Sequence, residues 1–231
     1  MKLIDEPNLR NKFYVFKDRL DAGEKLALKL EKVLEKPLEG WVLAIPAGGV
    51  PVGWVVSKRL GIPLDVLIVR KIQIPWDPEA GFGAVGWNGT VILNQVLVAN
   101  LGLTKEDIDN SIRLAKLKVE ERVKKLRQGK PFPNLEGKLS ILVDDGLATG
   151  YTMLTAVEIL AKYKPKKIVV ASPTGSFNAI NLLTSNPNVN LVVCLNLRGG
   201  PIFAVADAYK NWYDLTDEEV LKYLSNSSHK S

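Results

Sequence analysis

The chain contains very little cysteine and histidine, and these two shortages exclude several kinds of active site. Cys194 is the only cysteine and His229 the only histidine among 231 residues. A disulfide framework needs paired cysteines, and zinc clusters and His-dependent triads need several such side chains. Cys194 lies in an apolar run, where we expect a buried small side chain, and His229 lies in a polar tail. We therefore expect any metal to be bound by oxygen atoms.

Long hydrophobic runs are also missing. No segment approaches the ~18 apolar residues of a membrane span, and residues 1–20 carry charges throughout, unlike a signal peptide. We therefore expect no membrane partner and a cytoplasmic location. The hydrophobic fraction of 46% and charged fraction of 24% predict one globular domain over residues 1–224, with a disordered tail over 225–231. The net charge of +6 suits a ligand with several phosphates, and it equally suits weak attraction to nucleic acid or no specific partner.

Segments with strand and helix patterns alternate along the chain. This alternation predicts an α/β fold with a mostly parallel five-stranded sheet and helices on both faces. Residues 74–94 are rich in glycine, proline and tryptophan, so we expect a long flexible loop there, with a short hairpin at Asn88-Gly89. Strands are expected at 41–45, 64–70, 139–143, 167–171 and 191–195, and helices at 21–34, from the glycine turn to about 60, at 104–126 and at 216–224.

Residues 141–153, ILVDDGLATGYTM, combine a buried strand, two carboxylates and a loop of small residues that opens a helix. Asp144 and Asp145 come at the carboxyl end of the strand, where open α/β sheets bind ligands. The small residues allow backbone N–H groups and threonine hydroxyls to surround an anion at the helix N-terminus. A ribose 5-phosphate fits both parts. The alternative is an ordinary strand and helix, with the helix capped by Thr149 or Thr152.

A second glycine element, residues 45–53, follows the first core strand and reads IPAGGVPVG. Gly48 and Gly49 suit a tight backbone that offers N–H groups to an anion. Gly48 and Gly53 have the spacing of a P-loop, but Trp54 stands where that motif needs lysine, which disfavours ATP hydrolysis. In a flavodoxin-like strand order, the first and third strands are neighbours, so we expect both glycine elements to meet in one crevice.

Three further patterns have more than one interpretation. Residues 81–86 satisfy G-x-G-x-x-G, but they neither follow a clear strand nor open a helix, so we expect a hinge of a mobile loop rather than a dinucleotide site. Arg70 and Lys71 are expected to end the second strand at the rim of the crevice, the alternative being a cationic strand end in water. The basic face of helix 104–126 contains interleaved acids, which favour a solvated surface or a dimer contact, the alternative being a face that follows phosphates.

The stretch 141–153 closely resembles the signature of the type I phosphoribosyltransferases. Similar residues at 18–23, 69–72, 78–79, 83–85, 212–213 and 217–220 extend the resemblance, to an uncharacterised subfamily of predicted phosphoribosyltransferases. Related sequences have arginine before the two glycines of the second element, where this chain has Ala47. The resemblance implies binding of the ribose and 5-phosphate of phosphoribosyl pyrophosphate by Asp144, Asp145, Gly146, Leu147, Ala148, Thr149, Gly150, Tyr151 and Thr152. It implies binding of pyrophosphate by Ala47, Gly48, Gly49, Arg70 and Lys71.

The function that the resemblance implies is transfer of the 5-phosphoribosyl group to a nitrogenous base, with a purine favoured, and release of pyrophosphate. Asp144, Asp145, Arg70 and Lys71 are the expected catalytic residues, with Mg²⁺ near the two aspartates through ribose hydroxyls or water. A hood over residues 196–214 is expected to recognise the base. Phe203 and Trp212 are its candidate stacking residues, packing being the alternative.

The expected partners are the two substrates and a second copy in a homodimer, without nucleic acid. A non-catalytic sensor with the same fold and a nucleotide-binding hydrolase are the alternative functions. The enzyme interpretation requires a cavity above the two aspartates. It fails if both acids turn inward to lysines or arginines with no cavity above them.

Overall fold

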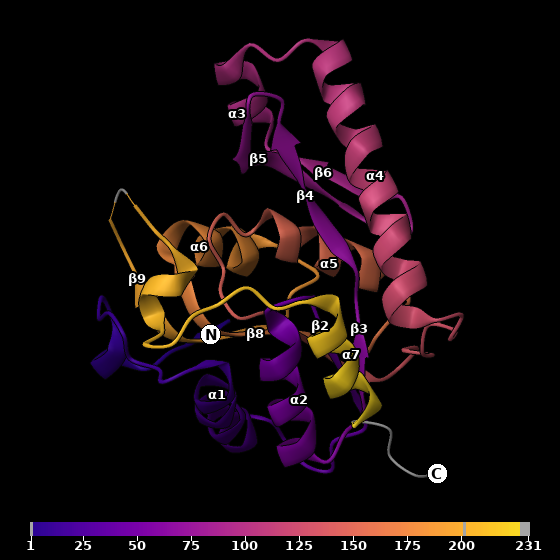
Figure 1. Cartoon of the computed structure of the whole chain (residues 1–231). Helices are drawn as coiled ribbons and strands as arrows, with labels where there is room; N and C mark the ends of the chain where they lie inside the picture. Colours follow the sequence, from indigo (N-terminus) through magenta and orange to yellow (C-terminus); the bar gives the residue numbers. More distant parts are fainter. Residues whose placement is uncertain (1, 201, 227–231) are drawn as a thin grey trace.

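The computed structural model describes residues 2–200 and 202–226, and a parallel sheet lies at its centre, with helices on both sides (Figure 1). The strand order is β1-β9-β8-β7-β2-β3, and every pairing is parallel. The predicted α/β class and the neighbouring first and third core strands are confirmed. The sheet has a sixth strand because the two-residue β1, too short for a sequence pattern, pairs with β9. The strands are β1 (Leu3–Ile4), β2 (Gly40–Ala44), β3 (Leu64–Val66), β7 (Leu139–Val143), β8 (Lys167–Ser176) and β9 (Leu191–Arg198).

Both faces of the sheet are buried, which explains why its strands are continuous apolar runs. Successive residues of a strand point to opposite faces, so Ile141 and Val143 of β7 enter one hydrophobic core and Leu142 enters the other. In Figure 1, α1 and α2 lie below the sheet and α5 and α6 above it. The helices are α1 (Arg19–Val33), α2 (Gly49–Leu60), α5 (Tyr151–Ala161) and α6 (Phe177–Ser185).

A second, antiparallel sheet stands beside the first and corrects two predictions. It contains β4 (Val69–Ile74), β5 (Asp77–Gly86) and β6 (Val91–Leu93) in the order β4-β5-β6. The predicted strand 64–70 is wrong because β3 ends at Val66 and β4 begins at Val69, in the other sheet. The predicted long loop over 74–94 is wrong because β5 and β6 occupy most of it, although Gly89 does turn the hairpin, with φ of 83°.

Close strand packing explains the glycines of this second sheet. A Cβ atom on Gly83 would lie 2.4 Å from the carbonyl oxygen of Ile92, on the neighbouring strand β6. Residues 82–86 are buried. Glycine here marks close contact between backbones rather than flexibility. The expected mobile hinge over the sugar is therefore a strand, and the G-x-G-x-x-G pattern opens no helix, as predicted.

Helices and a loop after the strands complete the fold. The long helix α4 (Lys105–Arg127) runs along the second sheet, and α3 (Gln95–Leu101) precedes it (Figure 1). Capping boxes at Thr104 and Thr216 begin α4 and α7 (Asp217–Ser225), where the predicted helices 104–126 and 216–224 start. The 3₁₀ turns are η1 (Pro7–Leu9) and η2 (Val205–Ala208).

Ser225, predicted to start a disordered tail, instead ends α7, and residues 227–231, with His229, lie outside the described residues. Over the ranges that the structure describes, no helix is long and apolar enough to cross a membrane.

Candidate functional site

A cavity of about 330 Å³ lies where β2 and β7 end at the carboxyl edge of the parallel sheet. Adjacent parallel strands present their loops at the same edge, which is why the two glycine elements meet there. Its lining comes from the turn after β2, from β4, from α4, from the turn after β7 and from α5. The lining residues are Ile45, Pro46, Ala47, Gly48, Val69, Arg70, Lys71, Gln73, Arg122, Asp144, Asp145 and Thr152.

The structure brings together part of the predicted site around this cavity. Seven predicted residues line it: Ala47, Gly48, Arg70, Lys71, Asp144, Asp145 and Thr152. The other predicted phosphate and pyrophosphate residues lie next to these in the chain but are not part of the lining: Gly49, Gly146, Leu147, Ala148, Thr149, Gly150 and Tyr151. Arg70 and Lys71 reach the cavity from β4 of the antiparallel sheet, not from the end of a strand in the parallel sheet.

The glycine turn after β2 lies directly against the two aspartates. A Cβ atom on Gly48 would lie 1.8 Å from Oδ2 of Asp145, and one on Gly49 would lie 2.9 Å from the Cα atom of Asp144. The Pro46–Ala47 peptide bond in this turn is cis. Only glycine allows the backbone to approach the carboxylates this closely, so the turn and the acids form one unit.

Asp145 is held by a buried arginine that the sequence prediction missed. Nε of Arg19 donates to Oδ2 of Asp145 at 2.8 Å, and the two side chains are 8% and 12% exposed. Nη1 of Arg19 donates to the carbonyl oxygen of Tyr213 at 2.8 Å, and Trp212 covers the guanidinium at 3.9 Å. The hydroxyl of Tyr209 donates to the backbone oxygen of Asp145 at 2.5 Å. Asp145 is thus turned toward an arginine, but the cavity above it is present.

Asp144 has a different environment, although it is the next residue. Its Oδ1 accepts a hydrogen bond from the backbone N–H of Asp145 at 2.8 Å, and no ion pair of Asp144 occurs within the described ranges. Burial raises the pKa of Asp144 well above its ordinary value, and the negative charge of Asp145 raises it further, against the opposing effect of Arg19. Asp144 is therefore the carboxyl group that would gain most from a cation or hydroxyl donors entering the cavity.

Three cationic residues line the same cavity as the two aspartates. Arg70 and Lys71 come from β4, and Arg122 comes from α4. Burial lowers the pKa of Arg70, and the like charge of Arg122 adds to that effect. Nη2 of Arg122 donates to Oδ1 of Asp217, in α7, at 2.8 Å. The lining of the cavity therefore combines three cationic residues with the two carboxylates.

Arg122 corrects the interpretation of the basic helix as only a solvated surface or dimer contact. The pattern of charges along α4 showed that one face is basic, but it contained no signal for which lysine or arginine turns toward the sheet. Arg19 gave a weak signal, since Asp18-Arg19 is part of the family resemblance. Its partner Asp145 is 126 positions away in the chain, and local spacing does not reveal such a contact.

The small-residue loop after Asp145 is anchored to the end of β8. The N–H of Leu147 donates to the carbonyl oxygen of Thr174, and the Ser176 hydroxyl donates to that of Ala148 at 2.6 Å. Gly150, with φ of 84°, begins α5, and within the described part of the chain no side chain caps this helix. The alternative of an ordinary helix capped by Thr149 or Thr152 is therefore wrong. The uncapped N–H groups keep the positive end of the helix dipole available to an anion.

The predicted hood contacts this loop, and its two candidate stacking residues, Phe203 and Trp212, lie in different parts of the molecule. Val205 packs against Gly146, where a Cβ atom would come within 2.3 Å of the valine side chain. Trp212 covers Arg19, whereas Phe203 lies 4.5 Å from the guanidinium of Arg198 and so belongs to a different part of the molecule. Neither ring lines the cavity above the aspartates.

Comparison with known proteins agrees with this architecture. A family model described as the phosphoribosyl transferase domain matches residues 88–174, which include both aspartates and the small-residue loop. Two Mycobacterium tuberculosis proteins, each named "Putative phosphoribosyl transferase", are 35% identical over 213 residues, 92% of this chain. The chain spans about half of their length, 47%.

A solved structure extends the similarity to the whole fold. The crystal structure of TT1426 from Thermus thermophilus is 32% identical, with a TM-score of 0.73, and the match covers 93% of this chain and 99% of that one. The match to the family model lies over the acidic strand end and its loop, where the described geometry places the cavity. Residues 88–174 thus match the phosphoribosyl transferase domain, and 92% of the chain is similar to proteins named putative phosphoribosyl transferases.

Proposed function

We propose that the chain is an enzyme that binds phosphoribosyl pyrophosphate in the 330 Å³ cavity and transfers its phosphoribosyl group to a nitrogenous base, with a purine favoured. One observation supports this most strongly: two carboxylates and three cationic residues line one cavity beside a helix start that no side chain of the described residues caps. We also propose a cytoplasmic protein that acts as a homodimer.

The proposed roles follow from the charges around the cavity. Asp144 and Asp145 accept hydrogen bonds from the ribose hydroxyls, which suits groups that offer only acceptors when ionised. The N–H groups at the start of α5 and the hydroxyl of Thr152 bind the 5-phosphate. Arg70 and Arg122, with Lys71, bind the pyrophosphate next to the glycine turn. Lys71 already extends toward β5, where its ammonium donates to the backbone oxygen of Glu79.

The proposed reaction needs no nucleophile from the protein. The bond between ribose C1 and the pyrophosphate oxygen breaks, the bond between C1 and a ring nitrogen of the base forms, and the base releases a proton to water. Negative charge increases on the departing pyrophosphate, and positive charge develops on the sugar ring. Cations already placed beside the pyrophosphate, and carboxylates near the sugar ring, lower the energy of the transition state. They do so without reorganisation during the reaction.

The residues around the cavity fit Mg²⁺ that is bound mainly by substrate. No cluster of three or more potential metal-binding side chains occurs within residues 2–200 and 202–226. Two carboxylates beside a phosphate site match the usual environment of Mg²⁺, which keeps several waters. When bound, the ion neutralises pyrophosphate charge, and Asp144 and Asp145 would hold it through ribose hydroxyls or water.

Calorimetry with phosphoribosyl pyrophosphate, with and without Mg²⁺, tests the binding step. We expect saturable heat in the presence of Mg²⁺, and its absence at millimolar ligand would contradict the proposal. A pyrophosphate-release screen over nucleobases tests the transfer step. Release that requires a base supports a transferase, and release without any base indicates a hydrolase instead.

A second candidate function is a non-catalytic sensor that uses the same site. Ala47 favours it, because this cavity-lining position is arginine in the sequences that the chain resembles. Binding of phosphoribosyl pyrophosphate without pyrophosphate release for any base would support the sensor. A salt-dependent shift of RNA or DNA by the pure protein would identify a nucleic-acid partner for it.

A further inference from the structure

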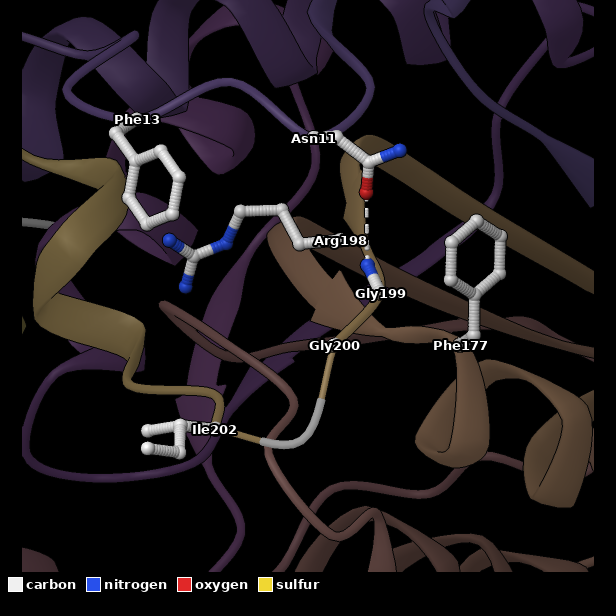
Figure 2. Close-up of a pocket in the computed structure, with 7 residues that line it drawn as sticks. All are labelled: Asn11, Phe13, Phe177, Arg198, Gly199, Gly200 and Ile202. Atoms are coloured by element: carbon white, nitrogen blue, oxygen red, sulfur yellow. Dashed lines mark hydrogen bonds between the residues drawn. The ribbon is translucent and has the colours of Figure 1, made fainter.

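A second cavity, of about 380 Å³, lies beyond the end of β9 (Figure 2). The loop before α1, the first residue of α6 and the segment after β9 form its walls. Parallel strands end at one edge of a sheet, so this cavity and the one above the aspartates lie along the same edge. Its lining residues are Asn11, Phe13, Phe177, Arg198, Gly199, Gly200 and Ile202.

Arg198 is a buried cation with unused hydrogen-bond donors. The residue is only 4% exposed, and among the described residues its Nε and Nη1 atoms have no hydrogen-bond partner. Nη2 donates to the carbonyl oxygen of Ala204. Oδ2 of Asp207 lies 3.7 Å from Nη1, beyond hydrogen-bond distance. A buried cation with two unpaired donors is costly for the fold, and an anion that accepts from them removes that cost.

Aromatic rings surround this guanidinium. The centroid of Phe13 lies 5.1 Å from it and that of Phe203 lies 4.5 Å from it. Figure 2 shows the arginine side chain extending toward Phe13, with Ile202 on the other side of the cavity. Phe13 is 62% exposed, so its ring is free to turn toward an incoming ligand. Rings and a cation together suit a flat, anionic molecule.

Gly199, at the start of the segment after β9, is held in place. The N–H of Gly199 donates to Oδ1 of Asn11 at 2.8 Å. A Cβ atom on Gly199 would lie 3.1 Å from the ring of Phe177, so the backbone already packs closely on that ring. The cavity is therefore largely formed before any ligand enters, as small-molecule sites usually are.

The same segment continues to the site above the aspartates. Val205 packs on Gly146, and the Tyr209 hydroxyl donates to the backbone oxygen of Asp145. Arg198 thus begins a stretch of chain that contacts the acidic loop through Val205 and Tyr209, seven and eleven positions later. This separation is about the length of a short loop. Its position suits a hood that places a second substrate beside the first.

We propose that the second cavity binds the acceptor, and that this acceptor is a heteroaromatic base with an anionic group, either a ring carboxylate or an acidic oxopurine. This inference rests on the proposed function. The anionic group accepts hydrogen bonds from Nε and Nη1 of Arg198, and the ring of the base lies against Phe13 or Phe203. A neutral base of the same shape accepts more weakly from Nε and Nη1 and therefore binds more weakly.

Matched pairs of probes that differ in charge test the proposal. Nicotinate and nicotinamide represent the ring carboxylates, and xanthine and hypoxanthine represent the oxopurines. Binding to the wild-type protein is measured by calorimetry near pH 8, with phosphoribosyl pyrophosphate binding measured in parallel. We expect one anionic probe to bind about tenfold or more tightly than its neutral partner. That pair identifies which kind of anion the cavity accepts.

Three variants connect this preference to the cavity. Arg198→Gln is expected to abolish the preference, and Arg113→Gln, at an exposed arginine of α4, to retain it. Phe13→Ala is expected to weaken both members of the preferred pair several-fold. Because Phe13 is exposed, this variant remains informative if Arg198→Gln fails to fold.

Equal binding of anionic and neutral probes to the wild-type protein would overturn the inference. So would pyrophosphate release with a neutral base that neither Phe13→Ala nor Arg198→Gln affects, and in that case the proposed transferase function would stand. Failure to bind phosphoribosyl pyrophosphate would instead refute the proposed function itself, and the acceptor role with it.

Discussion

The two adjacent aspartates are expected to respond oppositely to the same substitution. Asp145→Asn removes the carboxylate that pairs with Arg19 at 2.8 Å, where both side chains are nearly buried. Loss of one partner of a buried ion pair costs about 3–5 kcal/mol, because the other charge stays buried. In this variant Arg19 still donates to the carbonyl oxygen of Tyr213 and still packs on the ring of Trp212. We therefore expect a cost at the lower end of this range, about 3 kcal/mol.

Asp144→Asn is expected to leave stability unchanged or to raise it at neutral pH. Burial and the charge of Asp145 raise the pKa of Asp144 in the folded protein above its unfolded value. Between these two pKa values the folded state keeps a proton that the unfolded state has lost, so Asp144 lowers stability as pH rises through that window. The loss of stability is complete above the pKa of Asp144 in the folded protein, and it is absent when asparagine replaces Asp144.

Thermal and urea unfolding at several pH values measure this difference. For a chain of this length, 3 kcal/mol corresponds to a fall in Tm of roughly 6–12 °C for Asp145→Asn. Asp109→Asn, at an exposed position of α4, is the control and should change little. Equal losses for both site variants, or no loss for Asp145→Asn, would refute the reasoning that Asp145 stabilises the fold through Arg19 whereas Asp144 has no such partner.

Three further predictions concern the ligand. Arg122→Gln should raise KM for phosphoribosyl pyrophosphate and weaken pyrophosphate binding about tenfold. Lys125→Gln, which removes another ion pair between α4 and α7, should change neither quantity. Equal effects of the two variants would exclude a direct role of Arg122. Gly48→Ala places a methyl group 1.8 Å from Oδ2 of Asp145, so calorimetry should show at least a tenfold loss of affinity, and normal affinity would mean that the turn relaxes freely. Affinity for phosphoribosyl pyrophosphate with Mg²⁺ should rise with pH as Asp144 loses its proton; the same pH profile in Asp144→Asn would assign the titration to another group.

Local patterns were sufficient to predict most strands of the parallel sheet and the acidic loop. The apolar runs of β2 and β7 identify strands buried on both faces, because burial on both sides requires continuous apolar residues. The helix starts at Thr104 and Thr216 were predictable for a similar reason, since a capping box is complete within four residues. Each of these features depends on neighbours in the chain.

The antiparallel sheet depended on information that the local pattern lacks. Residues 74–94 contain glycines that usually indicate a loop, and only pairing of β5 with β4 and β6 makes them strands. Where the backbone of one strand lies against another, glycine is required by contact. Such a contact is a property of two segments, so neither segment shows it alone.

Sequence alone therefore determined most of the parallel sheet, the position of Asp144 and Asp145 at a strand end, and the glycine turn that faces them. Only the tertiary structure decided that Arg19 holds Asp145, that Arg122 joins Arg70 in the cavity, and that Arg198 is buried with two donors unpaired among the described residues. Ion pairs and desolvation act through space between segments far apart in the chain, and their geometry exists only once those segments have packed together.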